Sequence, residues 1–298
     1  MREAKIDKKI TKGRSQSEFH DLSERLLNSG DAYWGNLGFW KCANDYSMAC
    51  EALAHQLAIK VNLSEHSRIL DAGFGCGDQL LLWLEKYRVE FLCGVNYSVS
   101  QTKLAKQRLV DSGSTNINLD CLIQGDVSDL LDPALWGEIL IKDYLINTVL
   151  ALDCAYHFPS RKQFLADSYK LLSTSEVGRI GLTDIVLADE TLSWGKKVIL
   201  HSMLYLSRIP KSNIVTLSEY SNQLVQAGFH QIDSQDISEH VFEPFGAWLT
   251  SSKVGRRKLK GNIGAWLKYK VTAAFLTWAY RKQVLKYVII SAQARQRS

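Results

Sequence analysis

The glycine-rich segment at residues 69–79 constrains the fold of this chain more than any other feature. It has the sequence Ile-Leu-Asp-Ala-Gly-Phe-Gly-Cys-Gly-Asp-Gln and is followed by a helical pattern at 80–87. Glycine lacks a Cβ and adopts positive φ, so such a turn lets the backbone approach a ligand closely. A strand, a glycine turn and a helix in this order are typical of the edge where open α/β sheets bind nucleotides.

The rest of the chain supports a doubly wound, mostly parallel α/β sheet. An amphipathic helix is expected at 43–61, and short apolar runs then alternate with helical stretches. Seven strands are predicted, at 68–72, 89–95, 119–123, 145–152, 180–187, 229–241 and 285–291.

Composition excludes several classes of protein. The 298 residues are 46% hydrophobic, yet charges interrupt every apolar stretch before it reaches the roughly 20 residues of a membrane span. The basic N-terminus lacks the apolar run of a secretory signal, so we expect a cytoplasmic protein. The six cysteines are scattered, without a Cys-x-x-Cys pair, which argues against disulfides and structural zinc and predicts no metal site.

The net charge of +5 conceals an asymmetry along the chain. Residues 246–298 contain 12 Lys and Arg and no Asp or Glu, whereas residues 1–245 contain 24 basic and 31 acidic side chains. Such a segment suits an anionic membrane, nucleic acid or an anionic substrate, or is simply a solvated face. Within this segment, lysines at 268, 270 and 282 flank one apolar helical stripe, formed by Leu267, Val271, Ala274, Phe275 and Trp278. This pattern is typical of an interfacial helix, and the alternative is a helix docked on its own domain.

The spacing of the glycines distinguishes two kinds of ligand. A dinucleotide fingerprint would place its third glycine at position 78, which is an aspartate here. Asp71-x-Gly73-x-Gly75-x-Gly77 instead resembles motif I of class I S-adenosylmethionine-dependent methyltransferases. An acidic residue beside the ligand suits a cationic sulfonium and would repel a pyrophosphate. From about Tyr33 to its end the chain resembles the small-molecule branch, which includes sterol, tocopherol and sugar methyltransferases.

This resemblance implies a Rossmann-like fold that binds S-adenosylmethionine and releases S-adenosylhomocysteine. The block at 94–101 resembles the one that faces the ribose, although Asn96 stands where many relatives have a carboxylate. The block at 124–127 resembles the adenine-binding one, and the aromatic segment at 33–40 resembles a lid over the cofactor. The resemblance assigns cofactor contacts to Asp71, Gly73, Gly75, Gly77, Asn96, Tyr97, Gln101, Asp126, Val127 and Tyr33.

A histidine after the fourth predicted strand is the candidate for catalysis. The segment from Asp153 to His157 resembles the branch's acidic-x-x-x-His block, which would place His157 near the sulfonium methyl. In related sugar methyltransferases this histidine pairs with an aspartate at the end of the fifth strand, and the matching position is Asp184. His157 would then act as a general base oriented by Asp184. The alternative is a histidine that only caps a turn.

The resemblance implies one domain in four segments. These are an N-terminal lid with helices (1–60), a cofactor-binding core (61–189), a helical cap (190–228) and an end segment with a basic amphipathic helical insertion (229–298). The insertions suggest a sizeable apolar acceptor because they contain Trp194, Leu200, Met203, Leu204, Tyr205, Trp248, Trp266, Phe275 and Trp278.

We therefore expect a methyltransferase that acts on a small, lipophilic acceptor such as a sterol, quinone, tocopherol, prenyl or polyketide-like compound. Peripheral contact with an anionic membrane is a further expectation, and no nucleic-acid partner is expected. Two alternatives stay open: an RNA methyltransferase that grips RNA with its basic end segment, and a non-catalytic protein that binds S-adenosylmethionine. The acceptor atom and the oligomeric state are not predicted.

Overall fold

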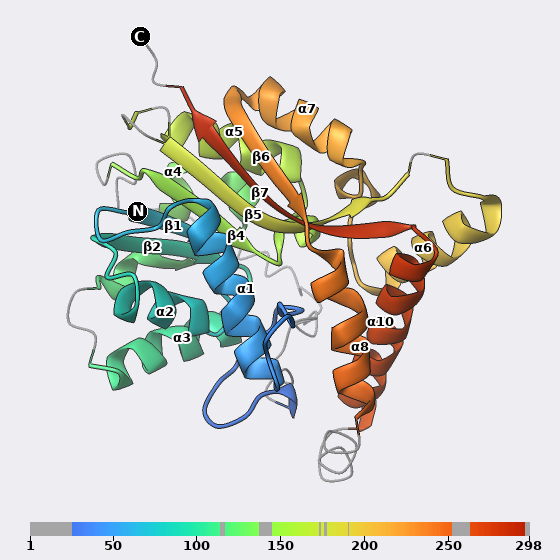
Figure 1. The fold of residues 1–298 in the computed structure, drawn as a ribbon. Coiled ribbons are helices and arrows are strands. Elements are labelled where there is room, and N and C mark those ends of the chain that lie inside the picture. Colours follow the sequence, from blue (N-terminus) through green and yellow to red (C-terminus); the bar gives the residue numbers. More distant parts are fainter. Residues whose placement is uncertain are drawn as a thin grey trace, which may run out of the picture.

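A computed structural model describes residues 26–113, 117–136, 145–172, 174–175, 178–189, 191–251 and 263–295. Within these residues a seven-stranded sheet has the order β3-β2-β1-β4-β5-β7-β6 (Figure 1). The strands are β1 (Arg68–Ala72), β2 (Phe91–Asn96), β3 (Leu122–Gln124), β4 (Thr148–Leu152), β5 (Gly178–Leu187), β6 (Phe229–Asp236) and β7 (Leu285–Ala294). The first five are parallel, and β7 runs antiparallel to β5 and β6. This confirms the predicted mostly parallel seven-stranded sheet.

Two strands begin later than their apolar runs predict, because local turns and backbone angles interrupt the extended conformation. β1 has the predicted bounds, but β3 begins later than expected because Asn118 caps a 3₁₀ turn over Leu119–Cys121 and accepts a hydrogen bond from Asp120 N at 3.0 Å. Leu145 has a φ of +48°, outside the β region, and β4 begins three residues after it.

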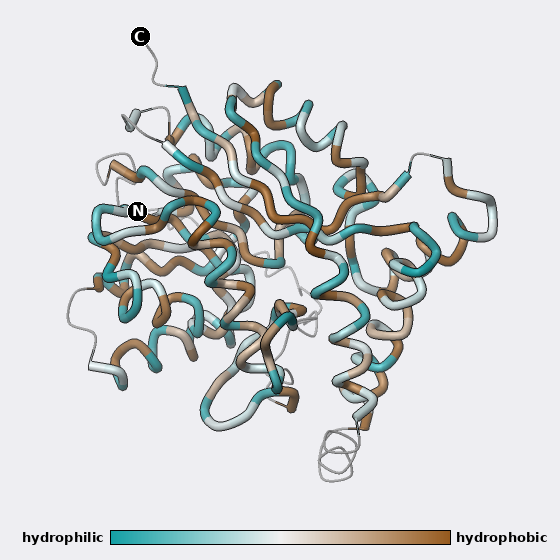
Figure 2. The backbone as a smooth tube through the Cα atoms, in the orientation of Figure 1, coloured by the Kyte–Doolittle hydropathy of each residue, from teal (hydrophilic) through white to brown (hydrophobic). Residues whose placement is uncertain are grey.

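Helices cover both faces of the sheet (Figures 1 and 2). One apolar cluster joins α1 (Tyr46–Lys60), α2 (Asp78–Glu85) and α3 (Val99–Asp111) to one face. A second cluster joins α4 (Pro133–Trp136), α5 (Arg161–Leu172) and α7 (Leu217–Ala227) to the other. Because both faces of the central strands are covered, β4 is buried along its whole length.

Three further helices stand beyond the sheet at the right of Figure 1. They are α6 (Trp194–Leu206), which follows β5, and α8 (Phe242–Thr250) and α10 (Ile263–Arg281), which lie between β6 and β7 in the chain. α8 and α10 pack against each other, whereas α7 packs against α5 and β6. The segment at 190–228, which is predicted to form one helical cap, therefore has two parts. α6 stands beyond the sheet, whereas α7 is one of the helices that cover a face of the sheet.

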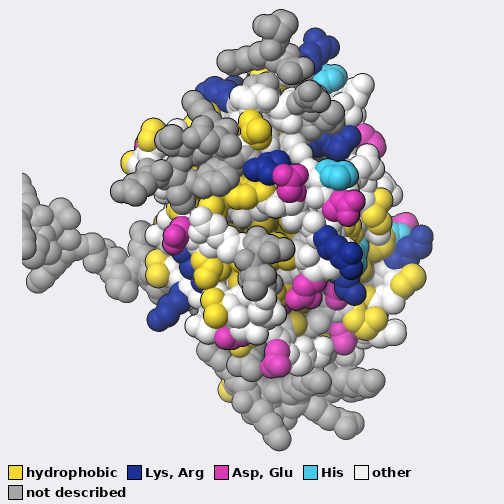
Figure 3. Space-filling model, turned by 90° about the vertical axis from the view of Figure 1, so that its left-hand side faces the viewer, with side chains coloured by type: hydrophobic (Ala, Val, Ile, Leu, Met, Phe, Trp, Pro, Cys, Tyr) yellow, Lys and Arg dark blue, Asp and Glu magenta, His cyan; other side chains and the backbone are white. Residues whose placement is uncertain are grey.

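The surface carries charges of both signs. On the face of the molecule that is turned to the left in Figure 1, Lys and Arg are interspersed with Asp and Glu around exposed apolar side chains (Figure 3). Among the described helices, none is long and apolar enough to cross a bilayer.

Candidate active site

A cavity of about 730 Å³ lies along the carboxyl edge of the parallel strands. One side is formed by the segment 33–37, the glycine turn after β1 and the residues that follow β2, β3 and β4. The opposite side is formed by α6, α8 and α10. Residues far apart in the sequence therefore meet at the edge where open α/β sheets bind ligands.

The glycine turn forms the floor of the cavity. Gly73 has a φ of +81°, and a Cβ built on it would lie 2.8 Å from the Cys154 sulfur, so neither the conformation nor the space admits a side chain. Gly73 and Gly75 line the cavity. Gly77 does not, because it packs against Ala105 of α3, where its Cβ would lie 2.9 Å from the alanine Cβ.

Asp71 lies behind the turn and outside the cavity lining, which corrects the expectation that its carboxylate faces the ligand. It is fully buried and accepts hydrogen bonds from Gln79 Nε2 at 2.8 Å and Trp83 Nε1 at 2.7 Å, both on α2. Burial raises its pKa to about 7 against these two bonds, which favour the charged form. Asp71 thus fixes α2, and Gln79 is the member of this group that reaches the cavity.

Asn96 lines the cavity at the end of β2 and connects two elements. Its side-chain oxygen accepts a hydrogen bond from Gly75 N at 3.2 Å, and its amide nitrogen donates to Gln101 Oε1 at 3.4 Å and Thr102 Oγ1 at 3.3 Å. An ionised carboxylate at this position could accept the first bond but could not donate the other two, so the amide of Asn96 suits it. Gln101 and the 71% exposed Tyr97 also line the cavity.

Asp126 and Val127 line the cavity beyond β3, as the resemblance expects. The Asp126 carboxylate caps the short 3₁₀ helix Val127–Asp129 and accepts a hydrogen bond from Ser128 N at 2.8 Å. The hydrogen bond from Ser128 N fixes one oxygen of the Asp126 carboxylate at the cavity wall.

The segment at 33–37 is held over the cavity by two carboxylates. Asp78 accepts a hydrogen bond from Tyr33 N at 3.0 Å and forms a two-bond ion pair with Arg108, at 2.7 and 2.8 Å. The Arg108 guanidinium also lies 5.2 Å from the centre of the Tyr33 ring. Four residues further along, Leu37 N donates to Asp153 at 2.7 Å. In the sequence, position 78 stands out only as an aspartate where a dinucleotide fingerprint has glycine, and no motif there indicates this role.

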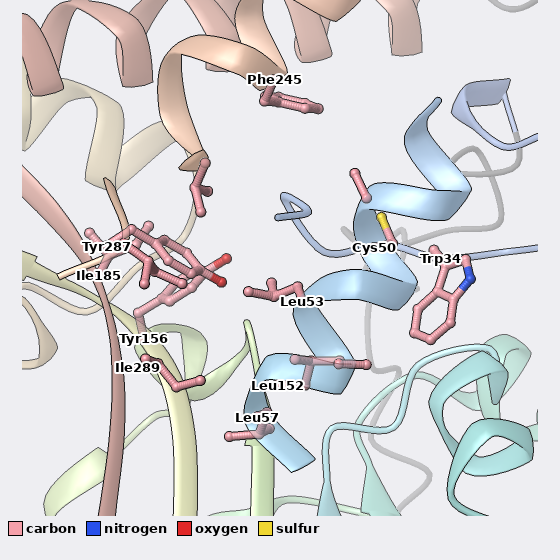
Figure 4. Packing of buried hydrophobic residues seen from close by; sticks show 14 of the residues in the cluster. Trp34, Cys50, Leu53, Leu57, Leu152, Tyr156, Ile185, Phe245, Tyr287 and Ile289 are labelled. Carbon is pink, nitrogen blue, oxygen red and sulfur yellow. The ribbon is translucent and has the colours of Figure 1, made fainter. Parts of the chain in front are cut away.

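Asp153 follows β4 with a φ of +55°, a region that non-glycine residues rarely adopt. Besides Leu37 N, its carboxylate accepts a hydrogen bond from the Tyr156 hydroxyl at 3.0 Å, while the Tyr287 hydroxyl donates to Thr183 Oγ1 at 3.3 Å. Figure 4 shows the two tyrosine rings together, with their hydroxyl ends pointing towards α1. Burial raises the pKa of Asp153 to about 7, despite these donors. The sequence around Asp153 does not indicate that its carboxylate holds Leu37.

His157 lines the cavity from the 3₁₀ turn after β4, but the predicted pair with Asp184 is not formed. The Asp184 carboxylate is fully buried and accepts hydrogen bonds from Arg161 Nη1 at 3.0 Å and the Tyr220 hydroxyl at 2.8 Å. Side chains alternate along a strand, so Thr183 faces Asp153 while Asp184 faces α5 and α7. β5 also continues to Leu187, so Asp184 does not stand at its end.

Comparison with known proteins agrees with this geometry. No protein-family model matches the chain. The erythromycin 3''-O-methyltransferase of Saccharopolyspora erythraea is 30% identical over 216 residues, which are 70% of this chain and 66% of that enzyme. The 27-O-demethylrifamycin SV methyltransferase of Amycolatopsis mediterranei is 24% identical over 246 residues, 77% of each protein. The chain belongs to the class I S-adenosylmethionine-dependent methyltransferases.

Solved structures of methyltransferases have the same fold at low sequence identity. A putative sarcosine dimethylglycine methyltransferase from Galdieria sulphuraria gives a TM-score of 0.69 at 16% identity, over 87% of this chain and 93% of that one. The geranyl diphosphate C-methyltransferase from Streptomyces coelicolor, in complex with Mg²⁺, geranyl diphosphate and S-adenosyl-L-homocysteine, gives 0.65 at 12% identity, over 93% and 98%.

The side of the methyltransferase cavity opposite the sheet is mostly apolar. Of the large side chains expected around an acceptor, Met203, Leu204 and Phe275 line it. The others do not: Leu200 and Trp266 are buried in the core, Trp194 and Tyr205 are more than 80% exposed, Trp248 stacks on Tyr46, and Trp278 stacks on Phe275. Among the described residues, no group of three His, Cys, Asp or Glu side chains could hold a metal ion.

Proposed function

We propose that this methyltransferase transfers a methyl group from S-adenosylmethionine to a hydroxyl of a small, lipophilic acceptor. The observation that carries the proposal is the composition of one cavity, with the glycine turn on one side and apolar side chains of α6 and α10 on the other. The erythromycin and rifamycin relatives, whose names assign methyl transfer to oxygen, support the hydroxyl as acceptor.

The cofactor fits the sheet side of the cavity. At Gly73 the backbone is open to a ligand without an intervening side chain, and Asn96 and Gln101 offer amide groups to a ribose. We assign Asp126 and Val127 to the adenine, and Tyr33, in the segment held by Asp78, to the covering lid. Bound here, S-adenosylmethionine supplies a methyl group whose bond to sulfur breaks with both electrons remaining on the sulfur.

The residues of the chain align the acceptor and handle the proton. As the acceptor oxygen forms its bond to the methyl carbon, the hydroxyl proton passes to a ring nitrogen of His157, because histidine is the side chain that most often acts as a general base. The lid and the apolar wall exclude water and fix the two reactants, which lowers the entropic barrier of the displacement.

Transfer of a labelled methyl group tests the proposal. Purified protein with methyl-labelled S-adenosylmethionine and host-cell extract should place label in the organic fraction, in a product whose mass rises by one methylene. Label in RNA would support the alternative of an RNA methyltransferase. Binding of S-adenosylhomocysteine without any transfer would support the non-catalytic alternative.

We also propose that α10 brings the enzyme to an anionic membrane. The helix buries Trp266, Ala273 and Leu276 but leaves Leu267 61% and Val271 46% exposed, one turn apart. Lys268 and Lys270 flank these apolar side chains, in keeping with an interfacial helix.

Vesicle sedimentation tests this contact. We expect binding to vesicles that contain phosphatidylglycerol, weakened by salt and by Leu267→Glu, but not by Val225→Glu on α7, whose side chain is 59% exposed. Equal sedimentation of the two variants would contradict a specific role of α10.

A further inference from the structure

Asn213 is a buried polar residue in the segment that links α6 to α7. It ends the short 3₁₀ turn Lys211–Asn213, in which its backbone N–H donates to Pro210 O at 3.0 Å. Ile209 and Ile214, on either side of this turn, line the active-site cavity, whereas Asn213 is only 2% exposed and does not. Its side chain is therefore bonded within the protein and is not in contact with a ligand.

The Asn213 side chain bonds the backbone on both sides of His157. Its amide nitrogen donates to Tyr156 O at 3.2 Å and to Phe158 O at 2.6 Å. Its amide oxygen accepts a hydrogen bond, at 3.4 Å, from the backbone N–H of Arg161, the first residue of α5. Both hydrogens and the oxygen of the amide are thus used, a set that neither an ionised carboxylate nor a hydroxyl supplies.

These bonds fix the backbone of His157. In the peptide before it, the oxygen (Tyr156 O) accepts from Asn213 and the N–H donates to Cys154 O at 2.9 Å. The N–H of the peptide after it donates to Ala155 O at 3.3 Å. A side chain leaves the backbone in a direction set by the two peptides around its Cα, so these bonds direct the imidazole, which lines the cavity, to one part of it.

We propose that Asn213 is a positioning residue for methyl transfer, which holds the His157 ring within reach of the acceptor hydroxyl through the carbonyl groups on either side of it. The inference rests on the proposed function, in which His157 takes the hydroxyl proton. A general base acts only within hydrogen-bond reach of that proton, and a misplacement of about 1 Å can lower a rate by about 10²-fold.

Asn213→Asp separates the two donated bonds from the rest of the side chain. The aspartate has the same shape and accepts from the backbone N–H of Arg161, but its ionised carboxylate has no hydrogen for Tyr156 O or Phe158 O. Asn213→Ala is the second variant, because it removes all three bonds without placing a charge in a buried site. Either variant that folds carries the test.

Asn147 offers a matched control at the opposite end of β4. Its side chain also bridges two backbone groups, since it accepts from Arg68 N at 2.9 Å and donates to His66 O at 3.0 Å. It precedes β4, whereas His157 follows that strand, and it does not line the cavity. Asn147→Asp and Asn147→Ala should lower the melting temperature but leave the rate of transfer unchanged.

The rate is measured as transfer from saturating methyl-labelled S-adenosylmethionine into the organic fraction of a fixed amount of host-cell extract. We expect Asn213→Asp and Asn213→Ala to lower it by about tenfold to 10²-fold, with unchanged affinity for S-adenosylhomocysteine by calorimetry. In a His157→Gln background the same changes should cost nothing further, because no base remains to be positioned. A merely structural role would add its loss in both backgrounds.

A spectroscopic measurement reports on the ring itself. The centres of the His157 and Tyr156 rings lie 4.6 Å apart, so the ring current of the tyrosine shifts the imidazole protons. In proton–carbon correlation spectra of protein with labelled histidine, the His157 signal is assigned by its loss in His157→Gln. We expect it to move or broaden in Asn213→Asp and to stay in place in Asn147→Asp.

The same measurements contain the contrary outcomes. A wild-type rate in both Asn213 variants, equal losses with and without the His157 ring, or an unchanged His157 signal would each overturn the proposal. A wild type that binds S-adenosylhomocysteine but transfers no label would refute the proposed methyl transfer instead. The His157 signal would then still decide whether Asn213 fixes the ring.

Discussion

Asp78 and Asp153 hold the two ends of one short stretch of backbone over the active site. Their acceptor oxygens receive the N–H groups of Tyr33 and Leu37, although Asp153 lies 116 residues from Leu37 in the sequence. Asp78 forms an ion pair with Arg108, whereas Asp153 accepts a hydrogen bond from the Tyr156 hydroxyl and has its pKa raised to about 7 by burial. The attachment through Asp153 therefore changes its charge near neutral pH.

Lid closure should depend on pH through Asp153. Above pH 7 the ionised carboxylate accepts hydrogen bonds from Leu37 N and the Tyr156 hydroxyl, and below it the proton occupies an acceptor site, so affinity for S-adenosylhomocysteine should fall as pH decreases from 8 to 6. Asp153→Asn should bind several times more weakly at pH 8, with a flatter pH profile, as measured by calorimetry. Asp71 also has a pKa of about 7. If the pH profile becomes flat in Asp71→Asn but not in Asp153→Asn, the pH dependence comes from Asp71 and the prediction is wrong.

Catalysis should depend on the His157 ring rather than on a His157–Asp184 pair. His157→Gln removes the proton acceptor, and we expect kcat to fall by about 10²- to 10⁴-fold with little change in S-adenosylhomocysteine affinity. Asp184→Asn should lower the melting temperature instead, because it leaves the buried Arg161 without its carboxylate. A kcat unchanged in His157→Gln would exclude the general base.

At the level of elements, the turn between β1 and α2 has no room for a side chain at Gly73, which lines the cavity. Gly73→Ala should abolish S-adenosylhomocysteine binding, because the new Cβ would lie 2.8 Å from the Cys154 sulfur at a φ of +81°. Gly195→Ala, in α6, is the control: nothing lies within 4 Å of its Cβ, and the change should stabilise the helix by about 0.5–1 kcal/mol. Titration calorimetry and thermal unfolding separate the two effects.

The sequence predicts elements better than it predicts the partners of their side chains. β1 has the predicted bounds because its apolar run is buried and a glycine turn follows it. The site residues at strand ends, Asn96 and Asp126 among them, reach the cavity because parallel strands end at one edge. Asp184 lies a few residues before a strand end, and only the alternation along β5 decides which face it occupies. The Asp153–Leu37 bond leaves no local pattern in the sequence.

For the whole molecule, the two carboxyl groups with raised pKa values predict how stability varies with pH. Asp71 and Asp153 have pKa values of about 7 in the fold, against an ordinary value of 3.8. Between these values the native state binds more protons than the unfolded state, so the free energy of unfolding falls as pH rises, by up to about 1.4 kcal/mol per pH unit for each group. Urea unfolding should therefore give a higher midpoint at pH 5.5 than at pH 7.5. A higher midpoint at pH 7.5 would contradict the raised values.

The position of β7 has a consequence for synthesis on the ribosome. Among the described strands β6 pairs with β7 alone, and β7 lies between β6 and β5, so β6 has no place in the sheet until β7 has been made. While α8 and α10 are translated, the nascent chain presents the unpaired edge of β5, a template for wrong strand pairing. At 5–20 residues per second this interval lasts for seconds, so folding of this enzyme should be most dependent on chaperones during synthesis of its final quarter.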